Sequence, residues 1–199
     1  MKLLNEKGEF INAIEGKELI KVSESKKFIK VQEKKGDVFF KNDYISRHIN
    51  KILDLNCIEV DLIKKKRFKI VVDAVNSTGG IAIPMLLDKL NVECIKIYCD
   101  PNGEFPHNPE PLPENITELS KSVVKNNADL GIVTDPDVDR LAFVCEDGLV
   151  FGEEYTLVAC SDYYLGLYKG PTVSNLSSSR ALREAVSYTH LRAHETVRN

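Results

Sequence analysis

Apolar residues recur at helical spacing in two stretches of the first third of the chain, 12–28 and 43–55. The second stretch has the fuller apolar stripe, formed by Ile45, Ile49, Ile52 and Leu53. Asn12 and Asp43 stand at the starts of these stretches, where residues of their type favour a helix N-cap. Residues 58–66 are predicted to form a short helix or a linker.

From residue 67 on, short apolar runs alternate with longer amphipathic segments, the pattern of strands alternating with helices. The predicted strands are 68–73, 94–98, 130–133, 141–145 and 171–174. The predicted helices are 81–90, 115–126, 153–168 and one that starts at Arg180. This order favours an α/β fold with a doubly wound, mixed but mainly parallel sheet, an α/β/α domain.

Three carboxylates alternate directly after the apolar run 130–133. Asp135, Asp137 and Asp139 occupy every second position, and Arg140 follows them. In extended backbone these side chains point the same way, and they repel one another unless a cation lies between them. Oxygen ligands suit a hard cation such as Mg²⁺, and α/β proteins bind ligands at the carboxyl ends of strands. The pattern therefore predicts a Mg²⁺ site, with Arg140 able to reach a phosphate; the structural alternative is a polar loop whose aspartates cap turns.

Two other motifs share part of this carboxylate pattern. Counted from Asp135, an EF-hand loop would have Glu146 at its twelfth position, but Arg140 occupies the sixth position, which requires glycine, and the flanks are strand-like rather than helical. We therefore reject an EF-hand. A phosphatase of the haloacid-dehalogenase type, with Asp135 as its nucleophile, stays open as an alternative, as does a Mg²⁺-binding module without chemistry of its own. Asp139 stands where the phosphatase pattern usually has threonine or valine.

Two further segments are candidates for ligand contact. Residues 76–80, Asn-Ser-Thr-Gly-Gly, could hold a phosphate at a helix N-terminus, although a strand–helix turn in which glycine supplies backbone freedom explains them better. His107 lies in the proline-rich loop 100–113, whose prolines restrict backbone rotation, and it could face a ligand. A lone histidine is more often structural.

Composition narrows the class of protein. The chain has 199 residues, of which 43% are hydrophobic and 29% charged, as in ordinary globular proteins. The formal net charge of −3 argues against a nucleic-acid surface, and no apolar run approaches the length of a membrane helix. Five scattered cysteines, an odd number without a secretory signal, favour a reducing cytoplasm.

The end of the chain is unlike the rest. Residues 186–196 resemble the translation of an adapter used in DNA sequencing libraries, and we interpret 186–199 as a read-through artefact. His190 and His194 belong to this tail, and their helical spacing is therefore not taken as a metal site.

Three segments together resemble the α-D-phosphohexomutase family. They are Thr-Asp-Pro-Asp-Val-Asp-Arg-Leu at 134–141, Val-Asp-Ala-Val-Asn-Ser-Thr-Gly-Gly at 72–80, and Phe-Pro-His-Asn-Pro-Glu-Pro at 105–111. The first is the specific one. The stretches 3–10 and 173–182 look like the branch that contains phosphoglucosamine mutase and phosphoglucomutase/phosphomannomutase.

The resemblance implies a division of the chain among the four domains of that family. Residues 1–66 would be the end of the first domain and a linker, and 67–169 the second domain with its Mg²⁺ loop. Residues 170–185 would start a truncated third domain, followed by the tail 186–199. The family's phosphoserine stretch, Thr-Ala-Ser-His-Asn-Pro, does not occur in this sequence, so we expect the chain as given to be inactive.

The resemblance also assigns roles to single residues. Asp135, Asp137 and Asp139 would be Mg²⁺ ligands, Arg140 an active-site cation, and Lys2 an acid/base or a phosphate contact. The implied reaction interconverts hexose 6-phosphate and hexose 1-phosphate through a phosphoserine and a bisphosphate. Such transfers depend mainly on positioning and charge neutralisation. Which hexose is used cannot be read from this part of the chain.

Overall fold

The computed structural model describes residues 3–26, 37–175, 177–188 and 193–196. They divide into two compact units, 1–41 and 42–199. In the first unit, helix α1 (Ala13–Ser25) begins at Asn12 as predicted. The Asn12 side chain accepts the N–H groups of Ile14 and Glu15, and the Glu15 carboxylate accepts the N–H of Asn12. This reciprocal capping box fixes the start of the helix.

The second unit is built on a five-stranded sheet with the strand order β2-β1-β3-β4-β5. The first three strands in that order are parallel, and β4 and β5 continue the sheet antiparallel. The strands are β1 (Lys69–Asp73), β2 (Glu93–Ile97), β3 (Leu130–Thr134), β4 (Leu141–Cys145) and β5 (Val150–Phe151). The mixed α/β sheet predicted from the alternating pattern is confirmed.

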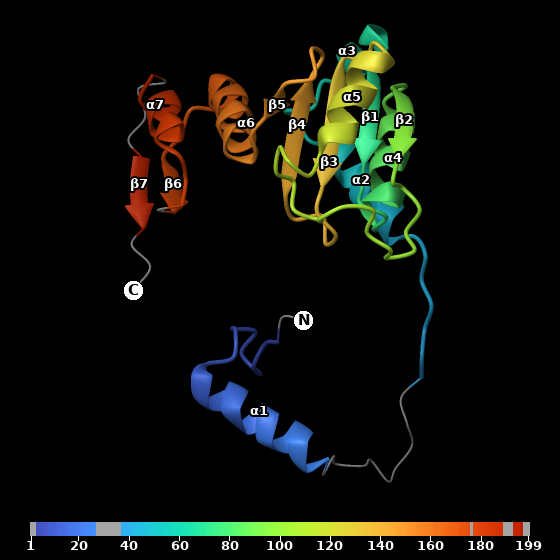
Figure 1. The fold of residues 1–199 in the computed structure, drawn as a ribbon. Helices are drawn as coiled ribbons and strands as arrows, with labels where there is room; N and C mark the ends of the chain where they lie inside the picture. The colour runs from blue at the N-terminus through green and yellow to red at the C-terminus, as the bar shows by residue number, and fades with distance from the viewer. Residues whose placement is uncertain (1–2, 27–36, 176, 189–192, 197–199) are drawn as a thin grey trace. The chain divides into compact units, whose positions relative to one another are not determined.

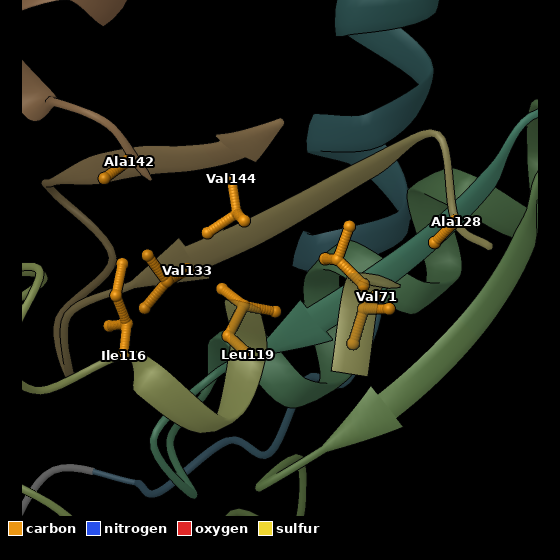
Figure 2. Close-up of a cluster of buried hydrophobic side chains, with 8 residues drawn as sticks. Val71, Ile116, Leu119, Ala128, Val133, Ala142 and Val144 are labelled. Carbon is orange, nitrogen blue, oxygen red and sulfur yellow. The ribbon is translucent and has the colours of Figure 1, made fainter. Parts of the chain in front are cut away.

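Helices cover both faces of this sheet (Figure 1). On one face α5 (Thr117–Lys125) packs over β1, β3 and β4, where Leu119 and Val123 meet strand valines. Figure 2 shows this cluster, with Val71, Val133 and Val144 from the three strands directed at Leu119. The other face carries α4 (Gly79–Lys89) and apolar residues of α2 (Tyr44–Leu53) and α3 (Val60–Lys66). Adjacent β1 residues serve opposite faces, Val71 the first and Ile70 and Val72 the second, as strand alternation requires.

Helices α2 and α3 lie in the compact unit with the sheet, and the domain boundary near Lys66 stays a prediction. The predicted side-chain cap of α2 is wrong. Asp43 has helical backbone angles and makes no capping hydrogen bond. Its carboxylate instead lies 4.0 Å from the Arg47 guanidinium, an exposed pair one turn apart.

The C-terminal part of the second unit follows the sheet's last strand. Helix α6 (Glu153–Leu167) is joined to the sheet by a ring contact between Phe151 and Tyr155. It is followed by β6 (Thr172–Asn175), α7 (Arg180–Tyr188) and β7 (Ala193–Thr196), which pairs parallel with β6. Val186 is buried against Leu165 and Leu182. The interpretation of 186–199 as an artefact stays a prediction; His190 lies outside the described residues, and His194 lies in β7.

Candidate functional site

Two segments that carry chemistry leave the sheet at the same edge. Strand β1 ends at Asp73 and the adjacent parallel strand β3 ends at Thr134, with Asp73 in register with Val133. The turn 74–78 and the loop 135–140 therefore begin side by side at the carboxyl ends of neighbouring strands. This is the edge at which α/β sheets bind ligands.

The structure brings the three predicted carboxylates together. One oxygen from each of Asp135, Asp137 and Asp139 lies within 4.8 Å of the other two. Asp135 is buried, with 2% of its surface exposed, whereas Asp137 and Asp139 are exposed. One of the three candidate ligands is thus fixed in the protein and the other two face solvent.

Asp135 also organises its own loop. Its Oδ1 accepts the backbone N–H groups of Asp139 at 3.1 Å and Arg140 at 3.0 Å, and its Oδ2 accepts Nε–H of Arg140 at 3.2 Å. Burial alone would raise the pKa of Asp135, but the hydrogen bonds that its carboxylate accepts, led by the one from the Arg140 backbone N–H, lower the pKa on balance. The carboxylate is therefore ionised and oriented, so that the turn-forming role and the predicted ligand role fall on the same residue.

The donor set fits a hard divalent cation. All three donors are carboxylates, which Mg²⁺ and Ca²⁺ prefer over nitrogen or sulfur. Ligands on opposite sides of Mg²⁺ lie about 4.2 Å apart, twice the Mg–O distance of about 2.1 Å. The carboxylate oxygens of the three aspartates lie up to 4.8 Å apart, which is slightly wider. Because the side chains of Asp137 and Asp139 are exposed, they can move inward by the small distance required.

Arg140 lies between two acids. Besides Asp135, it binds Glu110, with Nη1 donating to Oε2 and Nη2 donating to Oε1 at 3.1 Å. The hydrogen bonds from Arg140 lower the pKa of Glu110, and those acceptors raise the pKa of the guanidinium further above its ordinary value. Glu110 was missed by the sequence analysis, which considered only His107 in this loop.

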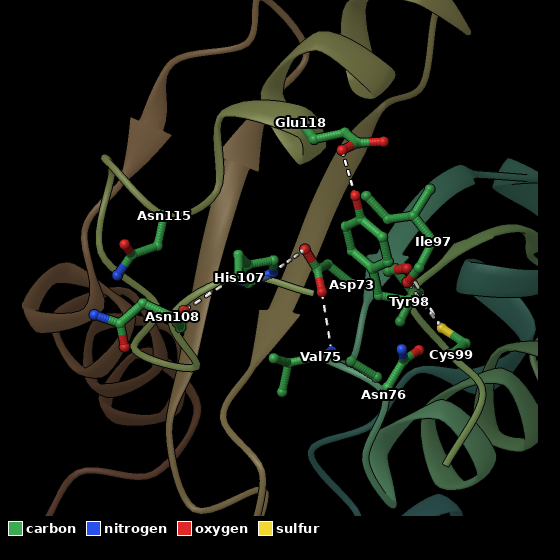
Figure 3. Close-up of polar contacts among 12 residues, drawn as sticks. Asp73, Val75, Asn76, Ile97, Tyr98, Cys99, His107, Asn108, Asn115 and Glu118 are labelled. Carbon is green, nitrogen blue, oxygen red and sulfur yellow. Dashed lines mark hydrogen bonds and ion pairs between the residues drawn. The ribbon is translucent and has the colours of Figure 1, made fainter. Parts of the chain in front are cut away.

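His107 contacts the buried carboxylate at the end of β1. Its Nε2 lies 3.0 Å from Oδ2 of Asp73, and its Nδ1 lies 2.8 Å from the carbonyl oxygen of Asn108 (Figure 3). A carbonyl can only accept, so Nδ1 carries a proton. The contact between Nε2 and Asp73 is a hydrogen bond that either group can donate. The predicted substrate contact of His107 stays a prediction; its contact with Asp73 is structural.

The turn after β1 has an unusual backbone. Val75 and Asn76 both have positive φ, 46° and 53°, which is rare for a β-branched residue. The Val75 N–H donates to Oδ1 of Asp73 at 3.0 Å, and the Asn76 side chain donates to the Glu104 carbonyl and accepts the Asp100 N–H. The turn thereby ties the loop 100–113 to the end of β1.

Gly79 and Gly80 start α4, as the strand–helix-turn interpretation of residues 76–80 requires. The reason for glycine at these positions differs from the predicted backbone freedom. Neither has a positive φ. A Cβ on Gly79 would lie 2.7 Å from Oγ1 of Thr134, and one on Gly80 would overlap the Cys99 backbone. These glycines allow close approach of helix and sheet rather than backbone freedom.

Asp73→Asn is expected to keep stability within about 1 kcal/mol at neutral pH. The amide oxygen can still accept from Val75, and its N–H₂ can donate to Nε2 of His107. Burial, partly offset by the Val75 N–H and by His107, raises the pKa of Asp73 above its ordinary 3.8. The folded carboxyl then keeps its proton at pH values where the unfolded chain has lost it. Its contribution to stability is complete below 3.8 and is lost as the pH rises through the folded pKa.

Urea unfolding of wild type and Asp73→Asn from acid to neutral pH measures this contribution. The difference between the two free energies should change in the variant's favour as the pH rises. Asp147→Asn, at an exposed hairpin position, is the control and should follow wild type. A constant difference between wild type and Asp73→Asn would contradict the prediction.

Lys2, the predicted acid/base, lies outside the described residues. The five residues that the structure does bring together are Asp135, Asp137, Asp139, Arg140 and Glu110. His107 and Asp73 support the loop that carries Glu110.

The family description "Phosphoglucomutase/phosphomannomutase, alpha/beta/alpha domain II" matches residues 44–148, which hold strands β1 to β4 and all five residues of this cluster. The chain belongs to the α-D-phosphohexomutase family. The matched segment also includes α2 and α3.

Individual relatives agree with this family. A protein of Methanopyrus kandleri named "Probable phosphoglucosamine mutase" is 32% identical over 153 residues, which are 76% of this chain and 33% of the relative. A "Phosphoglucomutase/phosphomannomutase" of Thermococcus kodakarensis is 35% identical over 126 residues, 63% of this chain and 27% of the relative. The chain therefore spans about a third or less of these relatives.

A solved structure shows the same fold. It is a phosphoglucomutase/phosphomannomutase family protein from Burkholderia thailandensis, which superposes with a TM-score of 0.70 at 22% identity. The match covers 93% of this chain and 39% of that protein.

Proposed function

We propose that this chain supplies the Mg²⁺-binding part of an intramolecular phosphotransferase that interconverts hexose 6-phosphate and hexose 1-phosphate. The observation that carries the proposal is the carboxylate cluster of the 135–140 loop, with Arg140 beside it, in a chain of this family. Phosphoglucosamine mutase is the preferred member, and phosphoglucomutase/phosphomannomutase is the alternative; relatives with both names align with the chain.

Asp135, Asp137 and Asp139 would hold the cation in this proposal. Bound Mg²⁺ would supply charge neutralisation for the transferred phosphoryl group. Asp135 keeps the loop in shape through the N–H groups that it accepts, so the two exposed carboxylates adjust while it stays fixed. Arg140 adds a permanent positive charge next to the cluster, where it can bind a phosphate oxygen.

The phosphatase alternative, with Asp135 as nucleophile, is disfavoured by the surroundings of that residue. Both oxygens of Asp135 accept N–H groups, and 2% of the residue is exposed. These bonds use three of the roughly four lone-pair sites of the carboxylate. The site left on Oδ2 can meet a small cation, but a residue that is 2% exposed has no room to attack a phosphorus atom. The family match gives the phosphatase no support.

The proposed activity can be tested on the full-length protein encoded by the source gene. We expect it to convert hexose 1-phosphates to hexose 6-phosphates, to lose this activity in EDTA and to regain it with MgCl₂. Assays with glucosamine, glucose and mannose phosphates would identify the sugar. The 199-residue chain alone should give no turnover, because its sequence contains no Thr-Ala-Ser-His-Asn-Pro stretch.

Two results would contradict the proposal. Release of inorganic phosphate without isomerisation would favour the phosphatase. Isomerisation that continues unchanged in EDTA would show that the activity does not need a metal ion. Residues proposed to act with the substrate beyond the cluster, Lys2 and His107, stay predictions. In the part of the chain that is described, no helix is long and apolar enough to cross a membrane; the cytoplasmic location also stays a prediction.

A further inference from the structure

Glu110 makes the most directed contact with Arg140. Its two carboxylate oxygens each accept from a different terminal nitrogen of the guanidinium. This forked arrangement fixes the plane of the guanidinium as well as its position. Both side chains are partly exposed, 35% for Arg140 and 45% for Glu110, so the contact lies at the surface of the candidate site rather than in the core.

The backbone around Glu110 is held by several contacts. The Glu110 carbonyl accepts the side-chain N–H of Asn115 at 2.9 Å and the backbone N–H of Leu112 at 2.8 Å. Pro109 and Pro111 flank it, which restricts the rotation of the chain on both sides, and Pro111 is buried. The glutamate is thus presented by a rigid segment and does not reach Arg140 from a flexible loop tip.

The same loop is attached to the sheet next to the carboxylate cluster. His107 contacts buried Asp73 at the end of β1 (Figure 3), and Asn76 binds both Asp100 and Glu104. Because β1 and β3 are adjacent, this attachment fixes the position of Glu110 relative to the 135–140 loop, which follows β3. Asp73 and His107 therefore hold in place the loop from which Glu110 contacts Arg140.

The hydrogen bonds of Arg140 leave part of its binding capacity unused. A guanidinium has five N–H donors. Nε donates to Asp135, and Nη1 and Nη2 each donate once to Glu110. One N–H on each terminal nitrogen then remains without a carboxylate acceptor in the described part of the chain. The arginine is oriented by two acids and can still offer two donors to a phosphate.

We infer that Glu110 is a positioning residue for Arg140, holding its guanidinium beside the carboxylate cluster in the orientation that receives a phosphate. The role in phosphate binding rests on the proposed function; the hold on Arg140 does not. A free arginine side chain would have to be ordered when the phosphate binds, which costs affinity. Glu110 orders it beforehand.

The first test observes Arg140 itself in the 199-residue chain. In low-temperature ¹H–¹⁵N NMR spectra, the Arg140 Nη–H signal, which reports the contact with Glu110 and is assigned by its loss in Arg140→Lys, should be shifted and slow to exchange. Glu110→Gln should weaken this protection by about three- to tenfold, and Glu110→Asp should keep the charge but hold Arg140 less well. Glu114→Gln, at an exposed glutamate in the same loop, is the matched control and should leave the signal unchanged. An unchanged Arg140 signal in Glu110→Gln would overturn the inference.

The second test is kinetic and uses the full-length protein. Glu110→Gln should lower kcat/KM by about three- to tenfold at unchanged unfolding free energy, although it removes a negative charge near a phosphate site. If kcat/KM rises instead, Glu110 competes with the phosphate for Arg140 and the inference is wrong. If the wild-type protein shows no mutase activity, the proposed function fails, while the NMR result still decides whether Glu110 holds Arg140.

Discussion

Gly80→Ala is expected to destabilise the sheet-containing unit by about 2 kcal/mol net, from an overpacking cost of about 3 kcal/mol, near the upper end of the usual range, less the gain in helix propensity. A Cβ at position 80 would lie 2.7 Å from both the Cα and the carbonyl carbon of Cys99, and closer still to its carbonyl oxygen. These are backbone atoms of the segment that leaves β2, so no side-chain rotation can relieve the overlap. Helix α4 would have to move away from the sheet.

Helix propensity opposes this cost but does not balance it. Gly80 lies in the first turn of α4 with helical backbone angles, and alanine there gains up to about 1 kcal/mol. Chemical denaturation of the chain measures the net effect. Gly166→Ala is the matched control, since a Cβ at this exposed position of α6 meets open space. It should leave stability equal or slightly higher.

Gly79→Ala tests overlap with a side chain, whereas Gly80→Ala tests overlap with the backbone. The nearest atom to a Cβ at position 79 is the Thr134 hydroxyl oxygen at 2.7 Å, part of a side chain that can rotate. We expect a smaller loss than for Gly80→Ala. If Gly80→Ala were as stable as Gly166→Ala, the close approach of α4 to the Cys99 backbone would be wrong.

These glycines show where sequence reasoning about the fold stops. Strands β1 to β4 and the helices of residues 67–168 follow from local periodicity, and the structure places them within a few residues of the predicted bounds. The two-residue strand β5 (Val150–Phe151) was not predicted, because two residues are too few to show a period. Periodicity cannot tell that Gly80 faces the backbone of Cys99, because this depends on how α4 is placed on the sheet. The sequence analysis therefore identified the turn but gave the glycines the wrong physical reason.

The candidate site divides in the same way. Asp135, Asp137 and Asp139 were predicted to converge because alternate side chains of extended backbone point the same way. The structure brings them together, but the extended backbone was wrong: residues 135–138 form a turn in which the Val138 N–H donates to the Asp135 carbonyl and Val138 has a positive φ of 60°. Glu110 and Arg140 are separated by 30 positions in sequence. Nothing local indicates their contact, which depends on the path of a loop attached through His107 and Asp73. A glutamate fixed between two prolines is a signal that could have drawn attention to it.

Asp137→Asn is expected to lower Mg²⁺ affinity by at least about tenfold while leaving the fold unchanged. Changes to residues that merely support metal ligands cost about 10- to 100-fold, and loss of a direct ligand should cost no less. Asp137 suits this test because it is exposed. Asp135→Asn would weaken binding as well, but Asp135 accepts the N–H groups that shape the loop, so its result would mix ligand loss with loop rearrangement.

Calorimetric titration of MgCl₂ into the 199-residue chain measures the effect, and circular dichroism and urea unfolding establish that the variants are folded. Asp147→Asn is the matched control, because its exposed carboxylate lies in the β4–β5 turn and its Oδ1 accepts the Leu149 N–H, which asparagine can also do. It removes the same charge from the chain and should bind Mg²⁺ like wild type. Equal Mg²⁺ affinity in wild type and Asp137→Asn would show that Asp137 is not a ligand. Equal losses in Asp137→Asn and Asp147→Asn would show that the ion responds to overall charge rather than to a built site. A loss confined to Asp137→Asn would establish the 135–139 loop as the binding site on measurements that need neither substrate nor turnover.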